Sequence, residues 1–122
     1  MKKSIWVVDD DEGILEVVRV LLEGEGYHVK TFVNGQSLRR LNMHGELPDL
    51  ILLDVLLSGE DGRDICRLLK HRQETKDIPV IMLSAHSSAA KVASVCGADD
   101  FIGKPFEIDA LIETIEKHLR GF

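Results

Sequence analysis

Three short apolar runs, none of them interrupted by a charge, constrain the fold of this chain most strongly. They are Ile5–Val8, Leu50–Leu53 and Ile78–Leu83, and each is rich in isoleucine, valine and leucine. A strand with one face in water alternates apolar and polar residues, whereas a parallel strand covered by helices on both faces is apolar throughout. The runs therefore predict parallel strands buried between two layers of helices.

The segments between these runs carry helical patterns and two weaker strands. Apolar residues recur at helical spacing from Ile14 to Leu22, and Gly24 and Gly26 then break that helix. Further helices are predicted around Leu38 and Leu41, from Asp61 or Gly62 to Leu69, over Ala89–Cys96 and from Ile108 to Leu119, with an edge strand at Val29–Val33 and a weak strand at Phe101 and Ile102. The order is strand–helix five times, which favours an α/β fold with an open parallel sheet.

The length and composition set broad limits on the kind of protein. A chain of 122 residues fits a single domain over residues 1–122 and can bury a real core without disulfides. The net charge of -6 argues against direct binding to nucleic acid or to an anionic membrane, and no apolar stretch is long enough to cross one. Cys66 and Cys96 fit no CxxC pair, so we expect two reduced, buried thiols in a cytoplasmic protein.

Polar residues stand at the carboxyl ends of the expected strands. Asp9 and Asp10 follow the first strand, Asp54 follows the third, Ser84 closes the fourth and Lys104 follows the fifth. In an open parallel sheet, ligands bind outside these ends, near the point where the strand order reverses. We therefore expect the five side chains to gather at one edge of the sheet.

Three carboxylates in one place repel one another unless a cation joins them. Magnesium suits an all-oxygen site with few protein ligands, and it would screen the charge of an incoming phosphoryl group. Lys104 adds a positive charge and Ser84 a hydroxyl donor for phosphoryl oxygens. Asp54 is then predicted to be the nucleophile that forms an aspartyl phosphate, with Mg2+ held by Asp9, Asp10 and Asp54.

Simpler interpretations exist for each residue taken singly. An aspartate after a strand often only caps the next helix, as Asp11, and with it Asp9 or Asp10, could do here. That interpretation is weaker for Asp54, because Val55, Leu56 and Leu57 do not start a helix. Lys104 taken singly would be an ordinary surface lysine. The five histidines have no metal-ligand spacing.

Taken together, these residues resemble the receiver domain of two-component response regulators over essentially the whole chain. Four segments carry the resemblance: Val7–Asp11, Leu52–Val55 with Gly62, Met82–Ala85, and Gly97–Phe106. Each is weak taken singly, but four in the right order, each at a strand end, form a specific pattern. The resemblance implies a flavodoxin-like, doubly wound fold with strand order 2-1-3-4-5 and five helices, two on one face and three on the other.

The resemblance also implies roles for particular residues and partners. A sensor histidine kinase or phosphotransfer protein would donate the phosphoryl group to Asp54, and the backbone carbonyl of Leu56 would join the magnesium ligands. The bond between Lys104 and Pro105 would be cis. Ser84 and Phe101 would form the switch, and output would pass through the fourth helix, fifth strand and fifth helix to an output protein or a missing effector domain. A phosphorylation-dependent dimer is one form such output takes.

The chain departs from the family pattern beside the acceptor. The family usually has Asp-x-x-Met-Pro, whereas Leu57 and Ser58 stand at the last two positions here, so this loop is less stiff. Leu56 offers no polar side chain beside the expected acceptor, and together with His86 it would alter how water reaches the phosphate. From Leu56 we expect slow self-hydrolysis of the phosphate. The stretch from Ser84 to Lys104 is also slightly shorter than in most members of the family. The family's output surface is therefore a poorer guide to this part of the chain.

Two other functions compete with a phosphoacceptor switch. A degenerate receiver would bind a partner without phosphorylation, but the full set of Asp9, Asp10, Asp54, Ser84 and Lys104 argues against that. A small phosphohydrolase with an aspartate nucleophile commonly needs a second aspartate two residues later, and Leu56 at that position cannot transfer protons. We therefore expect a signalling domain that is not an enzyme in the usual sense.

Overall fold

The computed structural model describes residues 2–39, 46–85 and 96–119. Its elements, in chain order, are β1 (Ser4–Val8), α1 (Glu12–Gly24), β2 (His28–Phe32), α2 (Gln36–Arg39), β3 (Leu50–Asp54), β4 (Leu56–Leu57), β5 (Glu60–Asp61), α3 (Gly62–His71), β6 (Val80–Ser84), β7 (Asp100–Gly103) and α5 (Ile108–Leu119). The expected helix over Ala89–Cys96, apart from its last residue, lies outside the described residues, as do Leu41 and His86.

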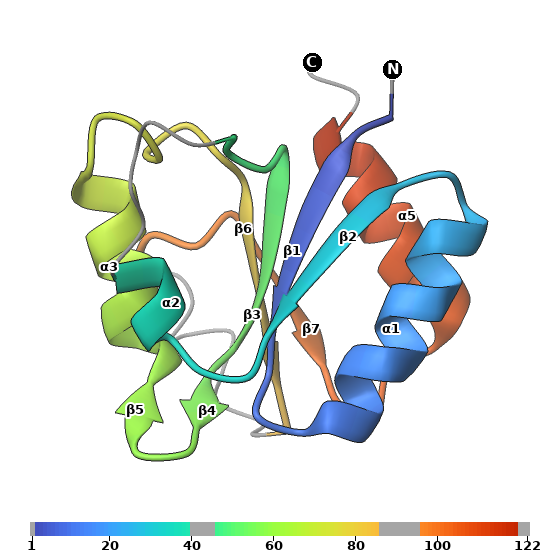
Figure 1. The fold of residues 1–122 in the computed structure, drawn as a ribbon, viewed down its shortest axis with the longest axis horizontal. Coiled ribbons are helices and arrows are strands. Elements are labelled where there is room, and N and C mark those ends of the chain that lie inside the picture. The colour runs from blue at the N-terminus through green and yellow to red at the C-terminus, as the bar shows by residue number, and fades with distance from the viewer. Residues whose placement is uncertain (1, 40–45, 86–95, 120–122) are drawn as a thin grey trace.

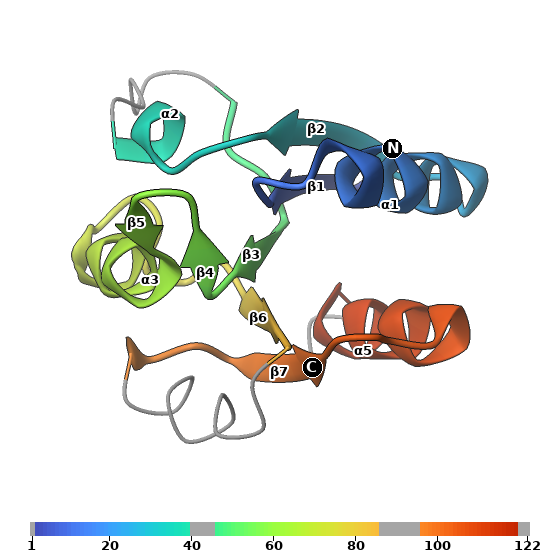
Figure 2. The same ribbon diagram turned by 90° about the horizontal axis from the view of Figure 1, so that it is seen from below.

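Five strands form one parallel sheet in the order β2-β1-β3-β6-β7, which confirms the expected order 2-1-3-4-5. Figures 1 and 2 show α1 and α5 on one face of this sheet and α2 and α3 on the other. Every residue of β3 and of β6 is buried, which explains their uninterrupted apolar sequences. The two outer strands, β2 and β7, are only partly buried, as edge strands are.

Two apolar clusters flank the sheet, because successive side chains of a strand point to opposite faces. From β1, Ile5 and Val7 join the cluster beneath α1 and α5, whereas Trp6 and Val8 join the cluster beneath α2 and α3. Trp6 is core, as expected, and packs edge-on against Phe32. Cys66 and Cys96 are buried free thiols, also as expected.

The element boundaries differ from the sequence expectations at a few places. Strand β6 starts at Val80 and not at Ile78, because the Ile78 N–H bonds the Thr75 carbonyl in a turn and Pro79 has no N–H for a ladder. Strand β3 includes Asp54 as its last residue. The antiparallel pair β4 and β5 was not expected from the sequence.

Helix starts follow the capping chemistry of the sequence. The Asp11 side chain caps α1 by accepting from the N–H groups of Gly13 and Ile14, and Asp61 caps α3 by accepting from the N–H of Arg63. Among the residues described, no helix has both the length and the apolar character needed to span a membrane.

Candidate functional site

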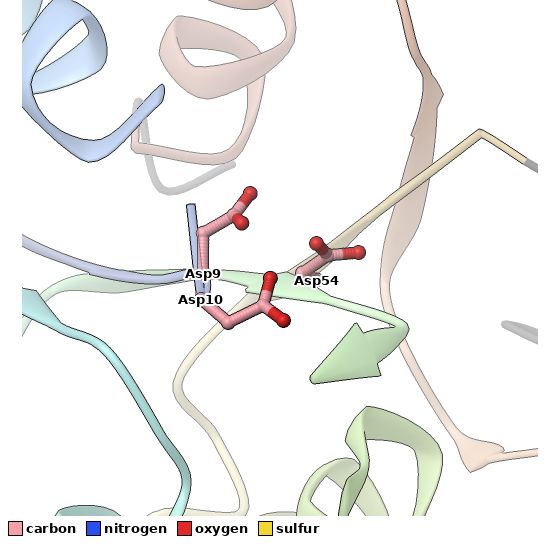
Figure 3. A group of neighbouring side chains, drawn as sticks. All are labelled: Asp9, Asp10 and Asp54. Carbon is pink, nitrogen blue, oxygen red and sulfur yellow. The ribbon is translucent and has the colours of Figure 1, made fainter. Parts of the chain in front are cut away.

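The carboxyl ends of β1 and β3 lie side by side in the middle of the sheet. Val8 pairs with Leu53, so the next residues along the two strands, Asp9 and Asp54, are neighbours. One carboxylate oxygen from each of Asp9, Asp10 and Asp54 lies within 4.8 Å of the other two, and Figure 3 shows the three side chains grouped together. The sheet topology therefore brings together the three aspartates that the sequence singled out.

Each aspartate reaches this place through its own local contacts. Asp9 is fully buried, and its Oδ1 accepts from the Asp11 N–H at 3.0 Å, which turns the chain from β1 into α1. Asp54 is also buried, and its Oδ1 accepts from the Leu56 N–H at 3.2 Å. Asp10 is exposed and accepts a hydrogen bond from the Ser58 hydroxyl at 2.7 Å.

Lys104 joins the two buried aspartates. Its Nζ donates to Asp9 Oδ2 at 2.7 Å and to Asp54 Oδ2 at 3.0 Å. The backbone N–H of Lys104 bonds the Ser84 carbonyl at 2.7 Å, which anchors the lysine to the end of β6. The peptide bond between Lys104 and Pro105 is cis, as expected.

The electrostatics of the site follow from burying these charges together. Burial raises the pKa of Asp54 above its ordinary value, and although a hydrogen bond from Lys104 opposes this, the charge on Asp9 adds to it. Burial alone would lower the pKa of Lys104, but its hydrogen bonds to Asp9 and Asp54 outweigh that effect and raise it. Lys104 therefore stays charged between two carboxylates, one of which ionises less readily than usual.

The backbone under Asp54 is packed very closely by the start of α3. A Cβ atom added to Gly62 would lie 2.0 Å from the Asp54 carbonyl oxygen and 3.1 Å from the Val55 Cα. The Gly62 N–H also donates to the Val55 carbonyl at 2.7 Å. Gly62 thus permits the helix to begin directly against Asp54.

The two expected switch residues lie on adjacent strands. Ser84 is buried at the end of β6, one position after Leu83, which is the strand partner of Asp54. Phe101 on β7 is half-buried and packs against the cluster beneath α2 and α3. The side chain of Leu56 is 54% exposed, so it projects into solvent close to Asp54.

Next to Phe101, Asp100 accepts a hydrogen bond from the Phe101 N–H and contacts the imidazole of His118 on α5 at 2.9 Å. Burial alone would raise the pKa of Asp100, but these hydrogen bonds outweigh it and lower the pKa. This cluster ties β7 to α5.

The donor set fits a magnesium ion. Three carboxylates offer only hard oxygen atoms, one of them exposed toward water, and Mg2+ characteristically keeps several waters. Asp9 and Asp54 already share one cation, the ammonium group of Lys104, which offsets one of the three negative charges. Residues that would hold the ion are Asp9, Asp10 and Asp54.

Sequence reasoning missed Ser58 as a member of this site. The missed signal was the Ser58-Gly59 dipeptide, a turn former between Leu56-Leu57 and Glu60-Asp61. In the structure these two residues form the turn of the hairpin between β4 and β5, and the turn places the hydroxyl against Asp10.

Comparison with known proteins identifies relatives of this chain among response regulators. The family model for the response regulator receiver domain matches residues 5–116. The chain is 36% identical over 122 residues to the phosphate regulon transcriptional regulatory protein PhoB of Rhizobium meliloti, with 98% of this chain and 53% of PhoB covered. It is 38% identical over 123 residues to the DNA-binding response regulator MtrA of Mycobacterium tuberculosis, with 98% and 52% covered.

Among solved structures, the signal receiver domain of a signal transduction histidine kinase from Syntrophus aciditrophicus matches with a TM-score of 0.87 and 34% identity, covering 98% of this chain and 91% of that one. The chain spans about half the length of the two curated relatives described above.

Proposed function

This chain belongs to the response regulator receiver domain family, and from that premise we propose that residues 1–122 act as a single phosphoacceptor switch in which Asp54 receives the phosphoryl group. The observation that carries the proposal is the geometry of the acceptor. Asp54 lies buried at a strand end, shares Lys104 with Asp9, and has Asp10 within reach. The proposed donor is a sensor histidine kinase or a phosphotransfer protein in the cytoplasm.

The proposed reaction assigns one task to each group. An Asp54 oxygen attacks phosphorus, a P–O bond forms, and the P–N bond to the donor's histidine breaks with its electron pair going to nitrogen. Asp9, Asp10, Asp54 and the Leu56 carbonyl would hold Mg2+, which when bound would neutralise charge on the phosphoryl oxygens. The ammonium group of Lys104, which already donates to Asp54 Oδ2, then donates to a phosphoryl oxygen and offsets its negative charge.

The proposed signal is a shift between two conformations. Contacts from Ser84 and Lys104 to the phosphoryl group form in the active conformation only, and they supply the difference in free energy that moves the equilibrium. A difference of about 1.4 kcal/mol changes the population ratio tenfold, so one or two hydrogen bonds suffice. Phe101 then moves toward the space that Ser84 leaves, and the surface of β7 and α5 changes for an output protein or an attached effector domain.

Intact-mass spectrometry after treatment with acetyl phosphate and Mg2+ tests the acceptor directly. We expect the wild-type protein to gain the mass of one phosphoryl group and the Asp54→Asn variant to gain none. Asp11→Asn is the matched control, because Asp11 caps α1 and has no assigned role in the chemistry. An equal gain in wild type and Asp54→Asn would remove Asp54 from its role.

A further inference from the structure

Ser58 lies at the tip of the hairpin formed by β4 and β5. Leu57 pairs with Glu60, which leaves Ser58 and Gly59 as a two-residue turn, and Gly59 has a φ of +72°. Across 48 positions of sequence, the Ser58 hydroxyl donates to Asp10 Oδ2 at 2.7 Å. This side-chain bond therefore joins the hairpin to the loop after β1.

We propose that Ser58 is a positioning residue for the magnesium ligand Asp10, and this inference rests on the proposed function. A carboxylate that binds a metal through one oxygen is commonly held in place by a hydrogen bond to the other. The Ser58 hydroxyl donates a hydrogen bond to Asp10 Oδ2, and Figure 3 shows the Asp10 carboxylate turned toward Asp54. The second oxygen can then face the ion.

Asp10 gains more from such support than the other two ligands. Asp9 and Asp54 are buried, and each is held by a backbone N–H as well as by Lys104. Asp10 is exposed, so its side chain would otherwise lose rotamer freedom when the ion binds. The Ser58 hydroxyl restricts that freedom beforehand.

The hairpin is itself well anchored, so Ser58 is presented from a fixed place. Leu57 is buried in the cluster beneath α2 and α3, and Glu60 Oε1 accepts from the Gly35 N–H at 3.1 Å. A positive φ in the second turn residue only is the type II pattern, in which proline is common at the first turn residue. The turn thus tolerates the proline of the family pattern, but proline has no hydroxyl to offer Asp10.

Magnesium titrations followed by amide shifts in NMR spectra test the proposal on the whole chain. We expect Ser58→Ala and Ser58→Pro to raise the Kd for Mg2+ by about tenfold, the lower end of the effect of losing such a support. Ser58→Thr keeps the hydroxyl and should stay within about twofold of wild type. Thr114→Ala removes a hydroxyl from α5 and should leave the Kd unchanged.

The outcomes separate this inference from the proposed function. If the wild-type protein binds Mg2+ and Ser58→Ala binds it with an unchanged or lower Kd, the positioning role is overturned and the proposed switch stands. A lower Kd would show that Ser58 competes with the ion for Asp10. Weakened binding in Ser58→Thr to the level of Ser58→Ala would also overturn it. A wild-type protein that binds no Mg2+ would overturn both proposals.

Discussion

Replacing Gly62 with alanine tests how closely the acceptor strand and α3 are packed. The added Cβ would lie 2.0 Å from the Asp54 carbonyl oxygen, whereas ordinary contacts lie between 3.4 and 4 Å, so the backbone must separate by more than an ångström. Such overpacking costs about 1–3 kcal/mol, and the 2.7 Å bond from the Gly62 N–H to Val55 adds about 1 kcal/mol if it breaks. Reduced freedom of the unfolded chain returns about 0.5 kcal/mol, which leaves a net loss of roughly 1.5–3.5 kcal/mol.

Urea denaturation followed by the fluorescence of Trp6, the single tryptophan, measures that loss. Gly24→Ala is the matched control, because a Cβ there meets nothing within 4 Å. We expect the control to change the free energy of unfolding by less than about 1 kcal/mol. A loss below about 1 kcal/mol in Gly62→Ala would show that the backbone relaxes freely and would refute the packing argument.

Three further changes test the electrostatics and the loop. Lys104→Met should cost roughly 3 kcal/mol of stability in urea denaturation, because two buried carboxylates lose their shared cation, and added Mg2+ should reduce the deficit; an equal deficit with Mg2+ would contradict this. Burial alone would raise the pKa of Asp100, but hydrogen bonds from His118 and from the Phe101 N–H lower it. The ionised form of Asp100 therefore stabilises the fold above the unfolded-state pKa of about 3.9. That stabilisation is lost as the pH falls through the lower pKa of the folded state. Asp100→Asn should therefore be less stable than wild type near about pH 7, with a gap that closes below about pH 4, and a constant gap in acid denaturation would refute this. Leu56→Asn should speed loss of the phosphoryl group by roughly five- to tenfold if the amide gives the attacking water one hydrogen bond of about 1 kcal/mol, whereas a wild-type lifetime of only seconds would contradict the expected slow hydrolysis.

The layered fold could be predicted from the sequence because burial on both faces leaves a strong mark. A strand that is covered by helices above and below is apolar along its length, and β3 and β6 show this pattern up to their last residues, Asp54 and Ser84. The strand order came from the family resemblance, since apolar runs do not record which strand lies beside which. The aspartates could be placed together because parallel strands end at one edge of the sheet.

The parts that could not be predicted depend on short elements and long-range contacts. Strands β4 and β5 have two residues each, too few to show any periodicity. The bond from Ser58 to Asp10 joins residues 48 positions apart, and no local rule reports it. Gly62 was recognised as part of a motif, but the close approach to the Asp54 carbonyl that requires it appears only in three dimensions.

Lys104 and Ser58 should act on the same cation in opposite directions. Lys104 holds oxygens of Asp9 and Asp54, so an ion that uses those oxygens must displace part of this ammonium contact, and the lysine lowers its affinity. Ser58 holds one oxygen of Asp10 while leaving the other for the ion, so the serine raises it. On the proposed function, that displacement would also free Lys104 to contact the phosphoryl oxygens, because its bond to Asp9 would be lost. On the proposed function, the affinity for Mg2+ would therefore depend on a balance between Lys104, which offsets one negative charge of the ligand set, and a hairpin that keeps the exposed ligand Asp10 in place.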